Sequence, residues 1–221
     1  MARAVIFDMD GVIVDSERYW RDEIEAILEA AGVGDDVDPE DVIGANVYDQ
    51  YDWLTDEHDP TITRAEYFDL FDERAKAVYT EHADLLDGFH DLLDELDARG
   101  VPTAVCTSSF PDWIEMAFDA HGLTGRFDDV VNAADLDVPG KPDPDIYEAA
   151  ADALGVPVTE CVVVEDSEHG VLSASRAGAH VIALETTVND EMDLSPADER
   201  ASDAADLRQR VLAALDATGS D

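Results

Sequence analysis

Residues 4–11 read AVIFDMDG, a short apolar run followed at once by two aspartates and a glycine. Continuous β-branched runs of this length are typical of parallel strands that are buried on both faces. Amphipathic helical patterns separate most of the later runs, and their alternation with strands predicts an α/β fold built on a doubly wound parallel sheet. The later strand candidates are TAVCT (103–107), DVVNA (129–133), CVVVE (161–165) and HVIAL (180–184).

The segment between the first two strand candidates breaks this rhythm. Residues 16–85 contain no convincing strand and carry two helical stripes, one around Trp20 and one around Phe71. A stretch of this length is too long to be a loop. We therefore expect a core domain made of residues 1–15 and 86–221, with an all-helical domain inserted at 16–85. The acidic, turn-rich stretch 185–206 predicts a solvated loop before the last helix.

The charge of the chain limits its partners. Asp and Glu number 54 against 13 Lys and Arg, which gives a formal net charge of −41. Nucleic acids and anionic membranes both require basic surface, so neither is an expected partner. The 46% of hydrophobic residues suffices for a packed core, so the chain is not expected to be disordered.

The lack of a recognisable targeting signal and the positions of the two cysteines favour a cytoplasmic protein. The N-terminal sequence MARAVIFDMDG lacks the basic and apolar regions of a signal peptide, and no run approaches 18 apolar residues. Cys106 and Cys161 lie in strand-like runs without the spacing of a zinc site. We expect both thiols to be buried and inert.

Chemistry-bearing side chains follow the strand candidates, where ligands of open α/β sheets bind. They are Asp8, Asp10, Thr107, Ser108, Lys141, Glu165 and Asp166, while Ser109 is a candidate N-cap of the next helix. Crowded carboxylates need a cation, and oxygen ligands favour Mg²⁺. A lysine with hydroxyl groups can hold a phosphate. An aspartate can attack phosphorus, and a second carboxylate can act as general acid. The set predicts Mg²⁺-dependent phosphoryl transfer.

The motifs DMDGV, TSS, GKPDPD and VVEDSEHG resemble, in order and spacing, those of the haloacid dehalogenase superfamily, and the helical insert resembles its first type of cap domain. The resemblance implies a Rossmann-like core and these roles. Asp8 is the nucleophile and a Mg²⁺ ligand, and Asp10 is the general acid and base and a ligand through its carbonyl. Thr107 and the Ser108 amide bind the phosphoryl group. Lys141 neutralises charge. Asp166 ligates Mg²⁺ directly, and Glu165 does so directly or through water.

Several activities occur on this fold, and the residues discriminate between them. A dehalogenase typically lacks the second aspartate, and a phosphonatase needs a cap amine, for which Lys76 is the single lysine available. The sequence is similar to the phosphoglycolate phosphatase and β-phosphoglucomutase branch. A mutase of that branch holds a distal phosphate with a cap arginine, but residues 44–54 contain no Arg or Lys. A non-catalytic binding protein would have lost the nucleophile or the acid.

These comparisons favour a phosphatase acting on a small phosphorylated metabolite, of the phosphoglycolate or sugar-phosphate type. The mutase and the binding protein remain as alternatives. Candidate substrate contacts on the cap side are Arg18, Asn46 and Tyr51. The expected assembly is a monomer or a homodimer.

The charge also generates a prediction about salt. With 36 aspartates, 18 glutamates and two lysines, the composition resembles that of proteins from salt-in halophiles. Self-repulsion at this charge weakens the compact state, and molar salt reduces the screening length to about 3 Å. We expect the melting temperature to rise steadily from low to molar KCl in a thermal scan. A melting temperature that is flat across this range would contradict the halophilic interpretation.

Overall fold

The computed structural model describes residues 3–34, 36–42, 47–133, 136 and 140–217. The chain divides into two compact units. One combines Met1–Asp15 with Asp84–Asp221, and the other is the intervening segment Ser16–Ala83.

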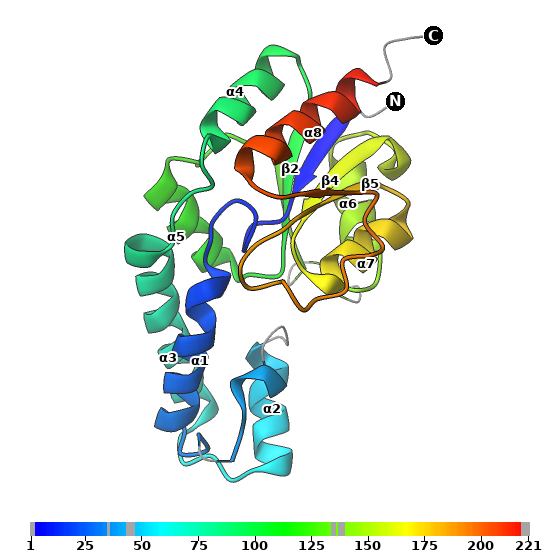
Figure 1. Cartoon of the computed structure of the whole chain (residues 1–221). Helices are drawn as coiled ribbons and strands as arrows, with labels where there is room; N and C mark the ends of the chain where they lie inside the picture. Colours follow the sequence, from blue (N-terminus) through cyan, green and yellow to red (C-terminus); the bar gives the residue numbers. More distant parts are fainter. Residues whose placement is uncertain (1–2, 35, 43–46, 134–135, 137–139, 218–221) are drawn as a thin grey trace. The chain divides into compact units, whose positions relative to one another are not determined.

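A parallel six-stranded sheet forms the centre of the first unit (Figure 1). Its order is β3-β2-β1-β4-β5-β6, and every pairing is parallel. The doubly wound sheet expected from the sequence is confirmed. Strands β1, β2 and β4 are buried along their whole length, as their continuous apolar runs predict. The strands are β1 (Ala4–Phe7), β2 (Thr103–Thr107), β3 (Asp129–Asn132), β4 (Cys161–Glu165), β5 (His180–Leu184) and β6 (Glu199–Ala201).

Helices pack on both faces of the sheet because successive side chains of a strand point to opposite sides. Ile6 of β1 belongs to a core cluster that also contains Ile146 and Ala174 of two helices, α6 and α7. The next residue, Phe7, instead meets Phe89 of α4 edge to face, with ring centroids 5.2 Å apart. The helices described in this unit are α4 (Phe89–Ala98), α5 (Pro111–His121), α6 (Asp145–Ala153), α7 (Glu168–Ala177) and α8 (Ala204–Asp216).

The stretch 185–206 is more ordered than the predicted solvated loop. It contains the short strand β6, whose Glu199 is in register with Ile182 of β5. Leu194 is buried in the same core cluster, and Asn189 is buried as well. The prediction of a simple solvated loop is therefore wrong: the segment contributes both an edge strand and core side chains.

The second unit contains helices and no strand among its described residues. It contains α1 (Glu17–Ala30), α2 (Val47–Glu57), α3 (Arg64–Ala77) and a π-helical turn over Val78–His82. Aromatic rings form its interior: Trp20 stacks on Phe71 at 6.0 Å, and Tyr67 lies 5.2 Å from Phe71. A capping box at Thr63 and Glu66 starts α3, because each side chain accepts a hydrogen bond from the other residue's backbone N–H.

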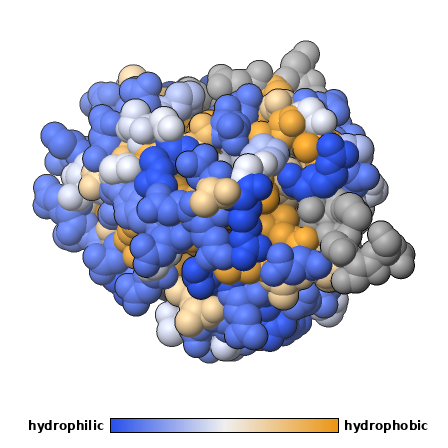
Figure 2. Space-filling model, turned by 90° about the horizontal axis from the view of Figure 1, so that it is seen from above, coloured by the Kyte–Doolittle hydropathy of each residue, from blue (hydrophilic) through white to orange (hydrophobic). Residues whose placement is uncertain are grey.

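One face of the molecule illustrates how hydrophilic and hydrophobic residues are distributed on the surface. On the face shown in Figure 2, hydrophilic residues dominate and hydrophobic ones show in smaller patches between them. Val130 and Val188 are the large hydrophobic residues that are exposed in the part of the chain that the structure describes. Within those same ranges, no helix has both the length and the apolar character needed to cross a membrane.

Candidate active site

The carboxyl ends of β1, β2 and β4 bring the predicted site residues to one edge of the sheet. Phe7 is in register with Val105 of β2 and with Val164 of β4. Asp8 therefore leaves β1 beside Glu165, and its N–H donates to the carbonyl of Val164 at 2.9 Å. This convergence follows directly from the parallel order β2-β1-β4.

Lys141 lies between two of these carboxylates. Its Nζ donates hydrogen bonds to Asp8 Oδ1 and to Glu165 Oε1, both at 2.7 Å. Nζ also lies 5.3 Å from the centre of the Tyr147 ring. The side chains of Lys141 and Asp8 are each 10% exposed, and that of Glu165 is fully buried. The structure thus unites a predicted nucleophile with a predicted phosphate-binding lysine.

Lys141, Asp8 and Glu165 shift one another's pKa values. Burial alone would lower the pKa of Lys141, but Asp8 and Glu165 outweigh burial and hold that pKa well above its ordinary value. Burial alone would raise the pKa of Glu165, but Lys141 and hydrogen bonds from Ser167 and Tyr147 lower it instead. Burial raises the pKa of Asp8 well above its ordinary range, because Lys141 offsets the effect only in part. Lys141 is therefore charged at neutral pH.

Glu165 accepts five hydrogen bonds. Its Oε1 accepts from Lys141 and from the Tyr147 hydroxyl at 2.7 Å. Its Oε2 accepts from the N–H of Asp166 and from both the N–H and the hydroxyl of Ser167, at 2.9–3.0 Å. Since a carboxylate offers about four lone-pair positions, these donors occupy its acceptor capacity. The Ser167 hydroxyl in turn accepts from the N–H of Gly170 and caps α7.

Asp8, Glu165 and Asp166 fit a metal ion by their chemistry. One carboxylate oxygen of each residue lies within 4.8 Å of a carboxylate oxygen of each of the other two residues. With all three carboxylates ionised, the single ammonium would leave two negative charges uncompensated, which a divalent cation would match. Oxygen donors alone favour a hard ion such as Mg²⁺.

Two glycines make room for these carboxylates. A Cβ at Gly11, where φ is +78°, would come within 2.0 Å of Asp166 Oδ2. A Cβ at Gly170 would come within 1.7 Å of Glu165 Oε1. The glycines of the first and fourth motifs are therefore required by close approach of the side chains that they face.

Thr107 and Asp10 are joined by a residue whose role the sequence did not indicate. The Ser109 hydroxyl donates to Asp10 Oδ2 at 2.6 Å, and the Ser109 N–H donates to Thr107 Oγ1 at 3.0 Å. Thr107 is buried, whereas Ser108 is exposed. The N-cap of α5 is Phe110, so the candidate cap at Ser109 is wrong.

Asn189 is a second residue that sequence analysis missed. Its Nδ2 donates to the carbonyls of Asp166 and Leu184, both at 2.8 Å, and its Oδ1 accepts from the N–H of Thr186 at 2.9 Å. It therefore ties the carboxyl end of β4 to that of β5. No local pattern marks this role, because Asn189 lies 23 positions from Asp166 in a polar, turn-rich stretch.

The predicted cap-side residues belong to the helical unit. The Arg18 guanidinium lies over the Tyr19 ring at 4.7 Å and donates to the Tyr19 hydroxyl. The Tyr51 hydroxyl donates to the carbonyl of Ile62 at 2.9 Å, a contact internal to that unit. Asn46 lies outside the described residues.

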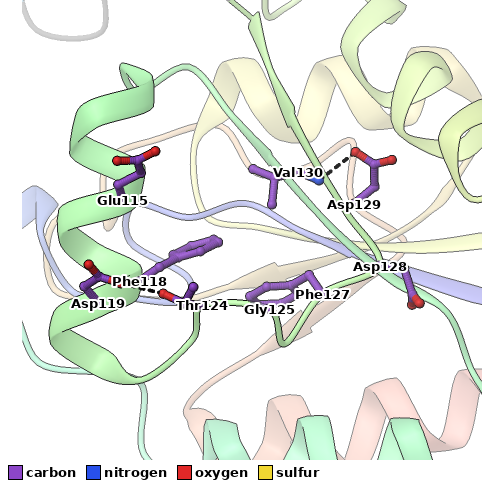
Figure 3. A pocket seen from close by; sticks show the side chains of 9 residues that line it. All are labelled: Glu115, Phe118, Asp119, Thr124, Gly125, Phe127, Asp128, Asp129 and Val130. Atoms are coloured by element: carbon purple, nitrogen blue, oxygen red, sulfur yellow. Dashed lines mark hydrogen bonds between the residues drawn. The ribbon is translucent and has the colours of Figure 1, made fainter.

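A cavity of about 460 Å³ lies elsewhere on the core, between α5 and the start of β3 (Figure 3). Phe118, Phe127 and Val130 supply its apolar wall, and Glu115 and Asp119 stand among its polar residues. It contains none of the strand-end residues described above. The amino end of a strand is also the opposite end from the one where open α/β sheets bind ligands.

The fold and the strand-end motifs match a known class of hydrolases. The family model described as haloacid dehalogenase-like hydrolase matches residues 2–178, a range that includes all four strand-end motifs. The chain therefore belongs to this family of hydrolases, as the motifs indicated.

Named relatives narrow the class further. Hexitol phosphatase A of Escherichia coli is 34% identical over 193 residues, which cover 82% of each chain. A probable pseudouridine-5'-phosphatase of Drosophila melanogaster is 33% identical over 186 residues, 81% of this chain and 80% of the relative. Among solved structures, CbbY of Rhodobacter sphaeroides in complex with phosphate superposes with a TM-score of 0.80 at 26% identity, covering 94% and 96% of the two chains. The expected phosphoric monoester hydrolase is confirmed.

The bond from Tyr147 to Glu165 allows a stability prediction. Tyr147→Phe removes a donor to a buried carboxylate, and a hydrogen bond to a charged group contributes about 2 kcal/mol. Tyr67→Phe is the matched control, because this equally buried hydroxyl donates to the neutral Gln50 Oε1 at 3.1 Å. We expect Tyr147→Phe to lower the free energy of unfolding more than the control, whose cost is about 1 kcal/mol. Urea denaturation without divalent cations measures both, and equal losses would contradict the role given to Glu165.

Proposed function

We propose that this protein is a Mg²⁺-dependent phosphatase that hydrolyses a small phosphomonoester through an aspartyl-phosphate intermediate. The observation that carries the proposal is the buried Lys141 held between Asp8 and Glu165, with Asp166 alongside. This arrangement supplies a nucleophilic carboxylate, a fixed positive charge for a phosphoryl group and a set of oxygen ligands at one sheet edge.

Asp8 is the proposed nucleophile. Lys141 holds its Oδ1, so we assign the attack to Oδ2. In the first step the Oδ2–phosphorus bond forms while the bond from phosphorus to the leaving oxygen breaks, and the electron pair of that bond stays with the leaving oxygen. Asp10 delivers a proton to this oxygen, and then takes a proton from the water that hydrolyses the aspartyl phosphate. The Thr107 hydroxyl and the Ser108 amide are the proposed donors to the phosphoryl oxygens.

The metal would be held by Asp8, Asp166 and the carbonyl of Asp10. We propose that Glu165 contacts the ion through a water molecule, because its own oxygens already accept five hydrogen bonds. When bound, Mg²⁺ neutralises carboxylate charge and stabilises the charge that develops on the phosphoryl oxygens. Lys141 and Glu165 fix the orientation of Asp8 for that reaction.

The two units have different proposed roles. The α/β unit carries the chemistry, and the helical unit is the proposed cap, with Arg18, Asn46 and Tyr51 as candidate contacts to substrate. Tyr51 already uses its hydroxyl within the helical unit, which favours a structural part for it. The strongly acidic chain supports a small free metabolite as substrate rather than a polyanion. The two free, buried cysteines support action in the cytoplasm, as a monomer or a homodimer.

Two observations support the proposed substrate class. They are the names of the relatives and the lack of arginine and lysine in residues 44–54. Relatives named for hexitol and pseudouridine phosphates are phosphatases. Residues 44–54 hold no arginine or lysine to grip a second phosphate, which favours hydrolysis over a phosphomutase reaction. We therefore propose a substrate of the phosphoglycolate or sugar-phosphate type, with a β-phosphoglucomutase-like reaction as the second candidate.

Phosphate release from a panel of phosphomonoesters tests the function. The panel contains phosphoglycolate, hexose and hexitol phosphates, nucleoside 5'-phosphates and p-nitrophenyl phosphate, in molar KCl with and without Mg²⁺. We expect Mg²⁺-dependent release that falls by at least about 10³-fold in Asp8→Asn, because the nucleophile is lost. Asp10→Asn should reduce turnover by about 10²–10⁴-fold through loss of proton transfer.

Asp119→Asn is the control, because it neutralises a carboxylate in the remote cavity of Figure 3 and should keep full activity. Substantial activity in Asp8→Asn would overturn the nucleophile assignment. Interconversion of sugar 1- and 6-phosphates after addition of a bisphosphate, without release of phosphate, would establish the mutase instead.

A further inference from the structure

Ser109 uses all three of its polar groups at the candidate site. Its hydroxyl donates to Asp10 Oδ2 at 2.6 Å, and its N–H donates to Thr107 Oγ1 at 3.0 Å. Its carbonyl accepts a hydrogen bond from Nδ2 of Asn132. Asn132 is buried and is the last residue of β3, in register with Thr107 at the end of β2. Ser109 is thereby held from two strand ends.

The local sequence explains why this hydroxyl is available. Helix α5 begins at Pro111, whose missing N–H needs no cap, and the N-cap is Phe110. Ser109 therefore lies one residue before the helix and does not cap it. Its side chain is directed to Asp10, which follows β1, the strand next to β2 in the sheet.

The contact favours a proton on one oxygen of Asp10 over the other. Because the Ser109 hydroxyl hydrogen points at Oδ2, a proton on Asp10 is favoured at Oδ1. The N–H of Ser109 acts in a similar way on Thr107: it occupies a lone pair of Oγ1, so the hydroxyl hydrogen of Thr107 remains available for an acceptor such as a phosphoryl oxygen.

We propose that Ser109 is a positioning residue that orients Asp10 for proton transfer from Oδ1 to the leaving oxygen, with Asn132 fixing the Ser109 backbone. The inference rests on the proposed function and adds to it the residue that orients the general acid Asp10. In this step the Oδ1–H bond of Asp10 breaks and an O–H bond forms on the leaving oxygen. The leaving oxygen has just gained the electron pair of the broken phosphorus–oxygen bond.

The dependence on leaving group tests this role. An alkyl alkoxide needs a proton as it leaves, whereas the p-nitrophenolate ion is stable without one. Ser109→Ala keeps every backbone contact and removes the hydroxyl alone. We compare kcat/KM, which reports the steps up to departure of the leaving group and not the later hydrolysis of the aspartyl phosphate that both esters share. We expect it to fall about 10- to 100-fold for the alkyl phosphomonoester that is most rapidly hydrolysed in the panel. The kcat/KM for p-nitrophenyl phosphate should fall less than about threefold.

Companion variants separate positioning from general damage. Ser109→Thr retains a hydroxyl at a half-buried position and should restore most of the alkyl-ester activity. Ser109→Cys has a similar size but is a weak donor, so it should reproduce the selective loss. Thr124→Val is the matched control: it removes another hydroxyl-to-carboxylate bond, from Thr124 to Asp119 at 2.7 Å, in the remote cavity of Figure 3. It should leave both rates unchanged.

The outcomes distinguish this inference from the proposed function. A selective loss in Ser109→Ala and Ser109→Cys with rescue by Ser109→Thr supports the positioning role. Equal losses on both esters, or none, overturn it while Asp10→Asn still shows the selective loss expected of the acid. If Asp10→Asn itself fails to discriminate between the esters, the general-acid step is wrong, and the positioning role falls with it.

Discussion

The candidate site depends on one buried contact between opposite charges, the Lys141 ammonium against the carboxylates of Asp8 and Glu165. Removing charges from water is costly unless each finds partners, and losing one partner leaves the others uncompensated. The contact joins β1, β4 and the segment after β3, because each contributes one of the three groups. The same contact that stabilises these charges also places the proposed nucleophile Asp8 beside a fixed positive charge, which would stabilise charge that develops on a phosphoryl group.

Burial also isolates this contact from the rest of an extremely acidic chain. Exposed charges respond strongly to ionic strength, because molar salt screens them within a few ångströms. The Lys141 cluster is nearly inaccessible and is screened much less. A chain with 54 acidic residues can thus depend on salt for the stability of its surface, while the internal geometry of its site is set by direct hydrogen bonds.

The sequence predicted the parts of the site that strand order alone brings together. Parallel strands must converge at their carboxyl ends, so the pattern of strands and helices suffices to group Asp8, Thr107 and Glu165. The supporting residues could not be predicted, because their roles arise from contacts across the fold. Tyr147 is fully buried and its hydroxyl reaches Glu165, a contact that no local pattern in the sequence indicates. The short strand β6 is polar and carries no apolar run, so only its pairing with β5 defines it.

Two carboxylates that are neighbours in sequence have different surroundings, and the start of helix α7 is one reason. The backbone and side chain of Ser167 at its N-cap, with the N–H of Asp166, occupy Glu165 Oε2, while Lys141 and Tyr147 occupy Oε1. A helix N-terminus favours negative charge, so Glu165 is retained as an ionised anchor for the lysine. Asp166 is buried against Gly11, where any side chain would displace it. The Glu–Asp pair therefore divides into a carboxylate whose oxygens are filled by protein donors and a carboxylate that we propose as the metal ligand.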